Sequence, residues 1–243
     1  MSSNRRIKRE FKQLTAANVQ EDYMPEHIQQ YAQSRIKPIE PLNQSQRDML
    51  SALLHDELVI GVGPAGVGKT MLATSVAADL YRHNHVKQII MTRPAVEVGR
   101  SLGYLPGDIN EKFAVYTEPF EQVLKYRLGE KYQADLHKKI HPLPIQYIRG
   151  RTFDDAVMLL DEAQNMTKTE IKALITRVGQ NCRLFITGDV NQSDLRDSDC
   201  GLRWLVDQIR KQQKRYEVIE FRKEDCVRSG LCADMLDLID NEI

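Results

Sequence analysis

The sequence predicts an α/β domain with a mostly parallel sheet flanked by helices, and three observations support this fold class. Apolar runs of strand length alternate with segments of helical periodicity along most of the chain. One such run, Leu58–Val62, leads directly into a glycine-rich loop that opens a helix. A second run, Val157–Leu160, ends in two acidic residues. Parallel strands need a crossover between them, and the intervening helical segments provide it.

Composition sets limits on the class of protein. The chain has 243 residues, of which 42% are hydrophobic, enough for one core-forming domain with an appendage. Lys+Arg and Asp+Glu both total 34, so any binding of nucleic acid must use a local basic patch. The chain shows no secretory leader and no apolar run of membrane-spanning length, so we expect a cytoplasmic protein without a membrane partner.

The first forty residues differ in composition from the rest. A basic cluster at 5–12 is followed by polar sequence up to the Pro-flanked segment 38–41. We predict an N-terminal extension over 1–40, partly helical or flexible, and one nucleotide-binding domain over 41–243. The basic cluster is either a solvated tail or a contact for a phosphate backbone or a neighbouring subunit.

The predicted elements follow from periodicity and from start and stop signals. The expected strands are Leu58–Val62, Gln88–Thr92, Ile145–Ile148, Val157–Leu160, Leu184–Thr187 and Val218–Phe221. The expected helices are Arg47–Leu54, one that begins at Gly68, Glu170–Gly179, Leu202–Gln212 and Cys232–Ile239.

The loop Gly63–Thr70 fills every position of the pattern GxxxxGK[ST]. Its glycines let the chain curl so that several backbone N–H groups point at phosphate oxygens. Lys69 adds a mobile charge for the β- and γ-phosphates, and Thr70 offers a hydroxyl to Mg²⁺. An ordinary Gly-rich turn is the alternative, which the preceding strand and the following periodic segment disfavour. The predicted nucleotide-binding residues are Gly63, Pro64, Ala65, Gly66, Val67, Gly68, Lys69, Thr70 and Met71, with ATP and Mg²⁺ as cofactors.

Two acids follow the strand Val157–Leu160. In a doubly wound sheet ligands sit at the carboxyl edge, so Asp161 is expected to face the same Mg²⁺ as Thr70. Glu162 is then placed to polarise an attacking water. An apolar run that ends in Asp-Glu is common by itself, but it is informative after a phosphate loop at this distance.

Two glutamines complete the predicted site. Gln192 follows the strand Leu184–Thr187, and we expect its amide to contact the γ-phosphate or the attacking water. A polar loop after a core strand is the alternative. Gln46 lies ahead of the phosphate loop, and its amide matches the donor and acceptor pair of adenine. The sequence has no NKxD element for guanine, which also favours ATP.

Four longer strings resemble the PhoH family of phosphate-starvation-associated ATPases from about Pro41 to the C-terminus. They are Thr92–Asp108, Ile148–Thr167, Ile175–Gly179 and Thr187–Leu195. The resemblance implies a RecA-like P-loop NTPase core similar to the first motor domain of superfamily 1 helicases, with ATPase activity and a ring-shaped, hexameric assembly. By that resemblance Gly63–Thr70 is Walker A, Asp161 and Glu162 are Walker B, and Gln192 belongs to a helicase-like motif III.

The chain departs from the family in two places. Some relatives carry a nuclease domain ahead of this core, which about forty residues cannot house, so we expect no nuclease activity. Near the C-terminus, Arg228 is retained but Ser229 stands where the family usually shows His. The function of that turn is correspondingly open.

The resemblance also implies that a neighbouring subunit completes the site. Helicases of this kind place ATP between two lobes, and the second lobe supplies an arginine to the transferring phosphate, whereas this chain has one lobe. Arg177 and Arg228 are the candidates for that arginine. A salt bridge or a solvated side chain is the alternative for each.

Single-stranded RNA or DNA is the leading expected substrate. Thr92 and Arg93 occupy the position of a helicase motif that grips single strands, and Arg149 and Arg151 add local positive charge. The aromatic residues Tyr104, Phe113, Tyr116 and Phe120 either stack on bases or pack the insertion that carries them. The alternative function is a slow ATP-dependent switch or scaffold that binds a protein partner. A small-molecule kinase would need an acceptor pocket and an Arg-rich lid, and the sequence shows neither clearly.

Overall fold

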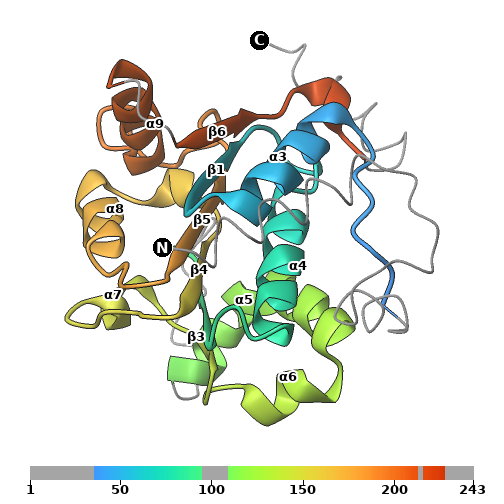
Figure 1. Cartoon of the computed structure of the whole chain (residues 1–243). Helices are drawn as coiled ribbons and strands as arrows, with labels where there is room; N and C mark the ends of the chain where they lie inside the picture. The colour runs from blue at the N-terminus through green and yellow to red at the C-terminus, as the bar shows by residue number, and fades with distance from the viewer. Residues whose placement is uncertain (1–35, 95–108, 213–215, 228–243) are drawn as a thin grey trace. The chain divides into compact units, whose positions relative to one another are not determined.

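The computed structural model describes residues 36–94, 109–212 and 216–227, with only the backbone described at 109–115. The compact unit begins at Glu40. Its centre is a six-stranded sheet with the strand order β3-β2-β4-β5-β1-β6, in which every neighbouring pair is parallel (Figure 1). The strands are β1 Leu58–Val62, β2 Gln88–Thr92, β3 Ile140–Pro142, β4 Ala156–Leu160, β5 Arg183–Gly188 and β6 Glu217–Glu220. The predicted parallel α/β fold is therefore confirmed.

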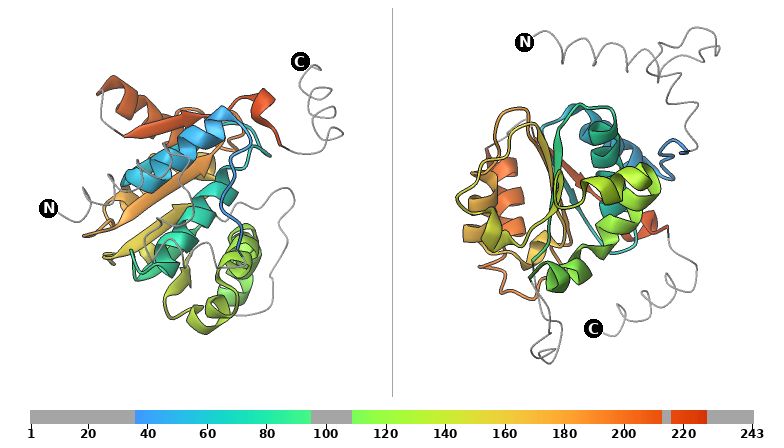
Figure 2. Two further views of the ribbon diagram at one scale, coloured as in Figure 1. Left: turned by 45° about the vertical axis from the view of Figure 1, so that its right-hand side comes forward. Right: turned by 90° about the horizontal axis from the view of Figure 1, so that it is seen from below.

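Helices cover both faces of the sheet, as Figure 2 shows from two further directions. The helices α3, α4 and α5 lie on one face and α7, α8 and α9 on the other. The helices are α3 Gln44–His55, α4 Lys69–Arg82, α5 Ile109–Leu128, α6 Glu130–Asp135, α7 Ile145–Ile148, α8 Lys168–Ile175 and α9 Gly201–Lys211, with 3₁₀ turns η2 Ala163–Asn165 and η3 Lys223–Asp225. None of the helices in the described part of the chain has the length and apolarity needed to cross a bilayer.

The central strands are apolar because both of their faces are covered. All five residues of β4 are buried, and β1 and β5 are each partly exposed only at their first residue. Such strands are continuous apolar runs rather than alternating ones, which is typical of parallel sheets. Polar side chains that follow these runs must lie at the carboxyl edge, where all six strands end.

The prediction of a strand at Ile145–Ile148 is wrong. This segment is the helix α7, and the third strand in chain order is Ile140–Pro142, which pairs with β2 at the edge of the sheet. Ile145 and Ile148 are both buried, and their spacing of three places them on one helical face. Pro142 ends the strand, and Pro144 begins the helix with its fixed φ of −55°.

Local capping signals explain where two helices begin. Asn43 accepts a hydrogen bond from the Gln46 N–H and starts α3 at Gln44, ahead of the predicted Arg47. Thr167 and Glu170 form a reciprocal capping box that starts α8 at Lys168. This helix ends at Ile175, four residues before the predicted Gly179. The helix predicted at Cys232–Ile239 lies outside the described residues.

Candidate nucleotide-binding site

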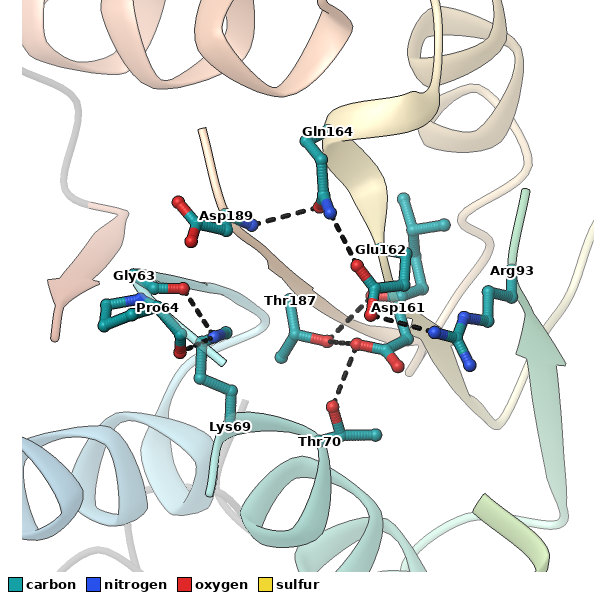
Figure 3. Close-up of polar contacts among 11 residues, drawn as sticks. Gly63, Pro64, Lys69, Thr70, Arg93, Asp161, Glu162, Gln164, Thr187 and Asp189 are labelled. Atoms are coloured by element: carbon teal, nitrogen blue, oxygen red, sulfur yellow. Dashed lines mark hydrogen bonds and ion pairs between the residues drawn. The ribbon is translucent and has the colours of Figure 1, made fainter. Parts of the chain in front are cut away.

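Four strands deliver polar residues to one edge of the sheet (Figure 3). The loop Gly63–Thr70 follows β1, and Arg93 follows β2. Asp161 and Glu162 follow β4, and Asp189 follows β5. Since these strands are neighbours and parallel, residues far apart in the sequence meet at this edge.

The phosphate loop has the backbone that its glycines permit. Gly63, Gly66 and Gly68 all have positive φ, at 140°, 85° and 89°. At Gly63 the approach of a neighbouring segment is also close, because a Cβ would lie 2.5 Å from the carbonyl oxygen of Phe221, after β6. The loop conformation is therefore restricted to glycine at this position for two independent reasons.

Lys69 is folded across its own loop. Its Nζ donates hydrogen bonds to the carbonyl oxygens of Gly63, at 2.6 Å, and Pro64, at 2.7 Å. Burial lowers the pKa of Lys69, and the negative charges of Asp189, Asp161 and Glu162 oppose this effect. The ammonium group thus lies where phosphate oxygens would be bound, and it must leave the two carbonyls to contact a triphosphate.

Asp161 is the most deeply placed acid of the site, with 5% of its surface exposed. Its Oδ1 accepts hydrogen bonds from the hydroxyls of Thr187, at 2.7 Å, and Thr70, at 2.9 Å. Burial raises the pKa of Asp161, and the hydrogen bond from Thr187 opposes this shift. The predicted pair of Thr70 and Asp161 is thus in direct contact, whereas Thr187 was not predicted.

The oxygen donors at this point fit Mg²⁺. A hydroxyl and a carboxylate stand side by side, and Mg²⁺ takes one or two protein oxygens together with waters and substrate phosphates. Within residues 36–94, 109–212 and 216–227, no group of three or more His, Cys, Asp or Glu side chains is arranged to hold a metal by itself. Thr70 and Asp161 would hold Mg²⁺ bound to a nucleotide, and the ion would supply charge stabilisation to the phosphates.

Each carboxylate oxygen of Glu162 accepts a hydrogen bond from another side chain. Oε1 accepts from Nη2 of Arg93 at 2.8 Å, and Oε2 accepts from Nε2 of Gln164 at 2.5 Å. Gln164 is only 2% exposed, and its Oε1 accepts the backbone N–H of Asp189 at 3.0 Å. Gln164 therefore joins the end of β4 to the end of β5. Sequence reasoning missed Gln164, although its place two residues after Glu162 was a signal.

Glu162 itself has a left-handed backbone, with φ 54° and ψ 39°. This conformation is uncommon for a residue other than glycine, and it costs free energy that the surrounding contacts must offset. It turns the chain sharply from β4 into η2. The turn presents the Glu162 side chain at the edge next to the phosphate loop (Figure 3).

The two predicted glutamines lie close to the phosphate loop or its neighbouring edge. Gln192 is exposed on the loop after β5, where its N–H donates to the Asp189 carbonyl at 3.1 Å. Gln46 is 1% exposed, and its amide accepts from the Leu42 N–H at 2.8 Å and donates to the Val67 carbonyl at 3.0 Å. Gln46 thus links the segment ahead of α3 to the phosphate loop. Its contact with adenine, and that of Gln192 with phosphate, stay predictions.

Other predicted residues lie elsewhere. Arg177 lies at the amino end of β4, where its carbonyl accepts the N–H of Phe153 at 2.9 Å, so it is on the far edge of the sheet from the phosphate loop. Arg149 and Arg151 follow α7 at the same far edge and are exposed. Arg228 lies outside the described residues.

Thr92 and Arg93, which are expected to contact nucleic acid, lie at the carboxyl end of β2. Thr92 is 1% exposed, and its hydroxyl has no hydrogen-bond partner among the described residues. Arg93 contacts Glu162. Of the aromatic residues, Phe120 is buried, which supports packing rather than stacking at that position. Tyr104 and the side chain of Phe113 lie outside the description.

A parallel sheet with a GxxxxGK[ST] loop after β1 and an Asp-Glu pair after the strand next but one to β1 defines a P-loop NTPase. The family can be stated as well. The family model described as PhoH-like protein matches residues 38–240, and the chain belongs to the PhoH family.

Relatives from several bacteria support this membership. The chain is 40% identical over 200 residues to Protein PhoH of Escherichia coli K12, an alignment that covers 80% of this chain and 56% of that protein. It is 40% identical over 209 residues to the PhoH-like protein of Bacillus subtilis, covering 85% and 65% of the two chains. For the PhoH-like protein of Mycobacterium tuberculosis H37Rv the identity is 38% over 206 residues, covering 84% and 58%. The chain therefore spans between half and two thirds of the length of these relatives.

Solved structures show a weaker likeness. The UvsW helicase from bacteriophage T4 is 17% identical with a TM-score of 0.46, covering 89% of this chain and 77% of that chain. The Pif1 helicase from Candida albicans is 16% identical with a TM-score of 0.39, covering 82% and 44%. Likeness at this level supports no conclusion about activity.

Proposed function

We propose that this chain binds ATP with Mg²⁺ and hydrolyses it, as an oligomeric PhoH-type ATPase in the cytoplasm whose turnover is coupled to single-stranded RNA or DNA. One observation carries the hydrolytic part. Lys69 and Thr70 begin α4, Asp161 and Glu162 follow β4, and the four meet at one edge of the sheet, with Thr70 and Asp161 in direct contact (Figure 3). These residue types in this arrangement serve phosphoryl transfer, where catalysis consists of positioning and charge stabilisation.

Each residue has a distinct function in the proposal. Lys69 leaves its loop carbonyls and binds the β- and γ-phosphates, while the backbone N–H groups of the loop hold the phosphates from the other side. Thr70 and Asp161 bind Mg²⁺. Glu162 orients and polarises the attacking water, and Gln164 holds Glu162 in place. Gln192 contacts the γ-phosphate or that water, and Gln46 with Met71 contacts the base.

The position of Arg177 supports a neighbouring subunit as the source of the final positive charge. Arg177 lies at the amino end of β4, and the five residues of that strand separate it from Asp161 by roughly 15 Å. An arginine at that distance cannot reach the phosphates of its own chain. If Arg177 acts in hydrolysis, it acts on the next subunit of a ring, which the family resemblance makes a hexamer. Arg228 remains the second candidate.

The proposed coupling to nucleic acid depends on local basic residues, because the net charge of the chain is zero. Arg93 lies at the carboxyl edge beside the acids of the site, and its guanidinium is partly exposed. Arg149 and Arg151 are exposed at the other edge. Single-stranded RNA or DNA that contacts Arg93 would be separated from Glu162 only by the Arg93 side chain. The binding of nucleic acid and the hydrolysis of ATP can therefore influence each other. The resulting activity is helicase-like or remodelling.

The test separates nucleotide binding from turnover. Lys69→Ala is expected to abolish tight ATP binding, because it removes the phosphate cation. Glu162→Gln is expected to keep binding and to lower turnover by about 10²–10⁴-fold, because only the water-activating group is lost. Binding is measured with a fluorescent ATP analogue and turnover by phosphate release. Equal loss of binding in both variants would show that the functions are misassigned.

Coupling is tested with the unmodified chain. Turnover is measured at low salt with and without single-stranded RNA and DNA, and we expect stimulation by at least one of them. Turnover that no strand changes would favour the alternative function, a slow ATP-dependent switch or scaffold for a protein partner.

A further inference from the structure

Arg93 and Glu162 form an ion pair. Arg93 is expected to contact single-stranded RNA or DNA, and Glu162 is expected to activate the attacking water. The sheet builds this contact. Thr92 pairs with Leu160 in the β2–β4 ladder, and the Asp161 N–H donates to the Thr92 carbonyl at 3.2 Å. Arg93 directly follows Thr92, whereas Glu162 lies two residues beyond Leu160, at the left-handed turn into η2. The two side chains meet at this turn, with Nη2 of Arg93 2.8 Å from Oε1 of Glu162.

We propose that Arg93 is a gate on Glu162, which means that its guanidinium holds Glu162 in an inactive arrangement. A backbone phosphate of bound single-stranded RNA or DNA opens the gate by binding the guanidinium in place of Glu162. This inference rests on the proposed function. Without a strand, Glu162 accepts one hydrogen bond on each carboxylate oxygen, from Arg93 and from Gln164. Each oxygen has a second acceptor site, so the restraint lies in the ion pair, which holds Oε1 against Arg93, whereas an attacking water must be bound in the direction of the phosphate. Glu162 is thus held in an inactive arrangement by Arg93, the same residue that is proposed to contact single-stranded nucleic acid.

The ion pair is suited to exchange. The Arg93 and Glu162 side chains are 25% and 39% exposed, so solvent screens the attraction between them and a second anion can reach the guanidinium. A backbone phosphate offers Arg93 charged oxygens in a geometry that a guanidinium can bind through two N–H groups. Gln164 is buried and bonded to the Asp189 N–H, so it stays in place when Arg93 leaves. Glu162 is then released on one oxygen and still oriented on the other.

The charges at the site add a second consequence. The positive charge of Arg93 also acts on the buried carboxylate of Asp161. When Arg93 moves to a strand phosphate, Asp161 and Glu162 lose a compensating cation, which favours the binding of Mg²⁺ with the nucleotide. Linkage requires that nucleotide and strand then strengthen each other's binding by the same factor.

The first experiment measures strand binding in a double-mutant cycle, by the fluorescence anisotropy of a labelled oligonucleotide without nucleotide. Glu162→Gln removes the charge that competes for Arg93, so it is expected to bind the strand about two- to five-fold more tightly than wild type, the range of a partly exposed ion pair. In the Arg93→Ala background the same change should have no effect. Equal affinity of wild type and Glu162→Gln would overturn the gate.

The second experiment measures turnover without a strand. Arg93→Ala is expected to raise it several-fold and to remove stimulation by the strand, while Arg93→Lys keeps a weaker form of both effects. Lys87→Ala is the matched control, because it breaks the Lys87–Asp155 ion pair at the amino end of β2, whereas Arg93 follows the carboxyl end of β2. Turnover of Arg93→Ala that falls toward the level of Glu162→Gln would show that Arg93 positions Glu162 and does not restrain it.

The two proposals fail in different ways. A wild type that binds no strand and is not stimulated would contradict the coupled function and the opening of the gate together. A wild type that binds and responds to a strand, with affinity independent of Glu162, would contradict the gate alone.

Discussion

Asp161 carries a carboxylate into a position that is almost closed to water. Two hydroxyls donate to its Oδ1, and the positive charges that act on it are those of Arg93 and Lys69. Burial of a charge costs free energy unless it is fully compensated, and the pKa of Asp161 is still raised. The site therefore holds a charge that suits a metal-bound nucleotide better than the empty protein.

The first prediction concerns Asp161→Asn. The pKa of Asp161 in the folded chain lies above its ordinary value of 3.8, so the charged form is disfavoured by folding at neutral pH. The amide of this variant would keep an acceptor for Thr70 and Thr187 without the charge. We expect the melting temperature without nucleotide to rise at pH 7, and the binding of Mg²⁺ with ATP to be lost. Thermal unfolding and nucleotide titration check the two effects.

The sign of the pH dependence follows from the same shift. The cost of the wild-type charge disappears as the pH falls through the raised pKa toward 3.8, so the stability advantage of Asp161→Asn should shrink in that window. Asp194→Asn is a control, because Asp194 is exposed. An Asp161→Asn chain less stable than wild type at pH 7 would contradict the argument.

Sequence alone could identify some residues of the site and not others. Lys69, Thr70 and Asp161 belong to local patterns, and their geometry follows from one loop and one strand end. Gln164 and Thr187 act through partners on another strand, so their function depends on which strands are neighbours. Arg93 was recognised as a functional candidate, but its contact with Glu162 depends on the pairing of β2 with β4 and on the left-handed turn at Glu162.

At the scale of the element, the phosphate loop depends on β6 as well as on β1. Phe221, which follows β6, donates its N–H to the Val62 carbonyl, and its own carbonyl lies against Gly63. The segment after β6, the last strand among the described residues, thus forms one wall of the phosphate loop. A change at either segment should affect nucleotide binding.

The element-scale prediction is that Gly63→Ala weakens nucleotide binding at least tenfold and lowers the free energy of unfolding by about 1–3 kcal/mol. The new Cβ would lie 2.5 Å from the Phe221 oxygen, and φ of 140° is unfavourable for alanine. The control is Gly129→Ala, where φ is 56° but the space around the Cβ is open. Gly129→Ala should cost about 1–3 kcal/mol through backbone strain and leave nucleotide binding unchanged. Chemical denaturation and ATP titration give both quantities.

The error at Ile145–Ile148 also belongs to the element scale. Four residues are too few for periodicity to separate a strand from one helical turn. The two prolines around Leu143 were the better signal, because Pro142 ends the edge strand and Pro144 can begin a helix. The longer apolar runs gave correct strands because their burial on both faces leaves little alternative.

At the scale of the whole molecule, the two edges of the sheet have different chemistry. The carboxyl edge holds the phosphate loop and the acids, and the amino edge holds Arg151 and Arg177, where Nη1 of Arg177 donates to the Arg151 carbonyl at 3.4 Å. If Arg177 is the arginine of the proposed hydrolysis, both edges are needed, and one chain cannot bring them together.

The whole-molecule prediction uses mixed subunits. Lys69→Ala chains keep Arg177 but bind no ATP, and Arg177→Ala chains bind ATP but lack the arginine. Each alone should be inactive, and a mixture should recover part of the wild-type turnover, because an arginine of this kind contributes about 10³–10⁵-fold. Phosphate release at several mixing ratios is the measurement.

The control for this experiment is the Lys69→Ala, Arg177→Ala double variant, which should restore nothing when mixed with Arg177→Ala. A parallel mixture with Arg228→Ala tests the second candidate. Recovery by neither would argue that hydrolysis uses groups of one chain only.

If Arg177 acts on a second copy, the opposition of the two edges limits the symmetry of the active assembly. A two-fold pair can exchange Arg177 between its members only if their strands run antiparallel, and this reciprocal contact then closes at two copies. In a head-to-tail contact, each copy instead places its Arg177 at the phosphate loop of the next copy. Such a contact gives the assembly a direction, and the angle it imposes decides whether the copies close into a ring or continue as a helical filament.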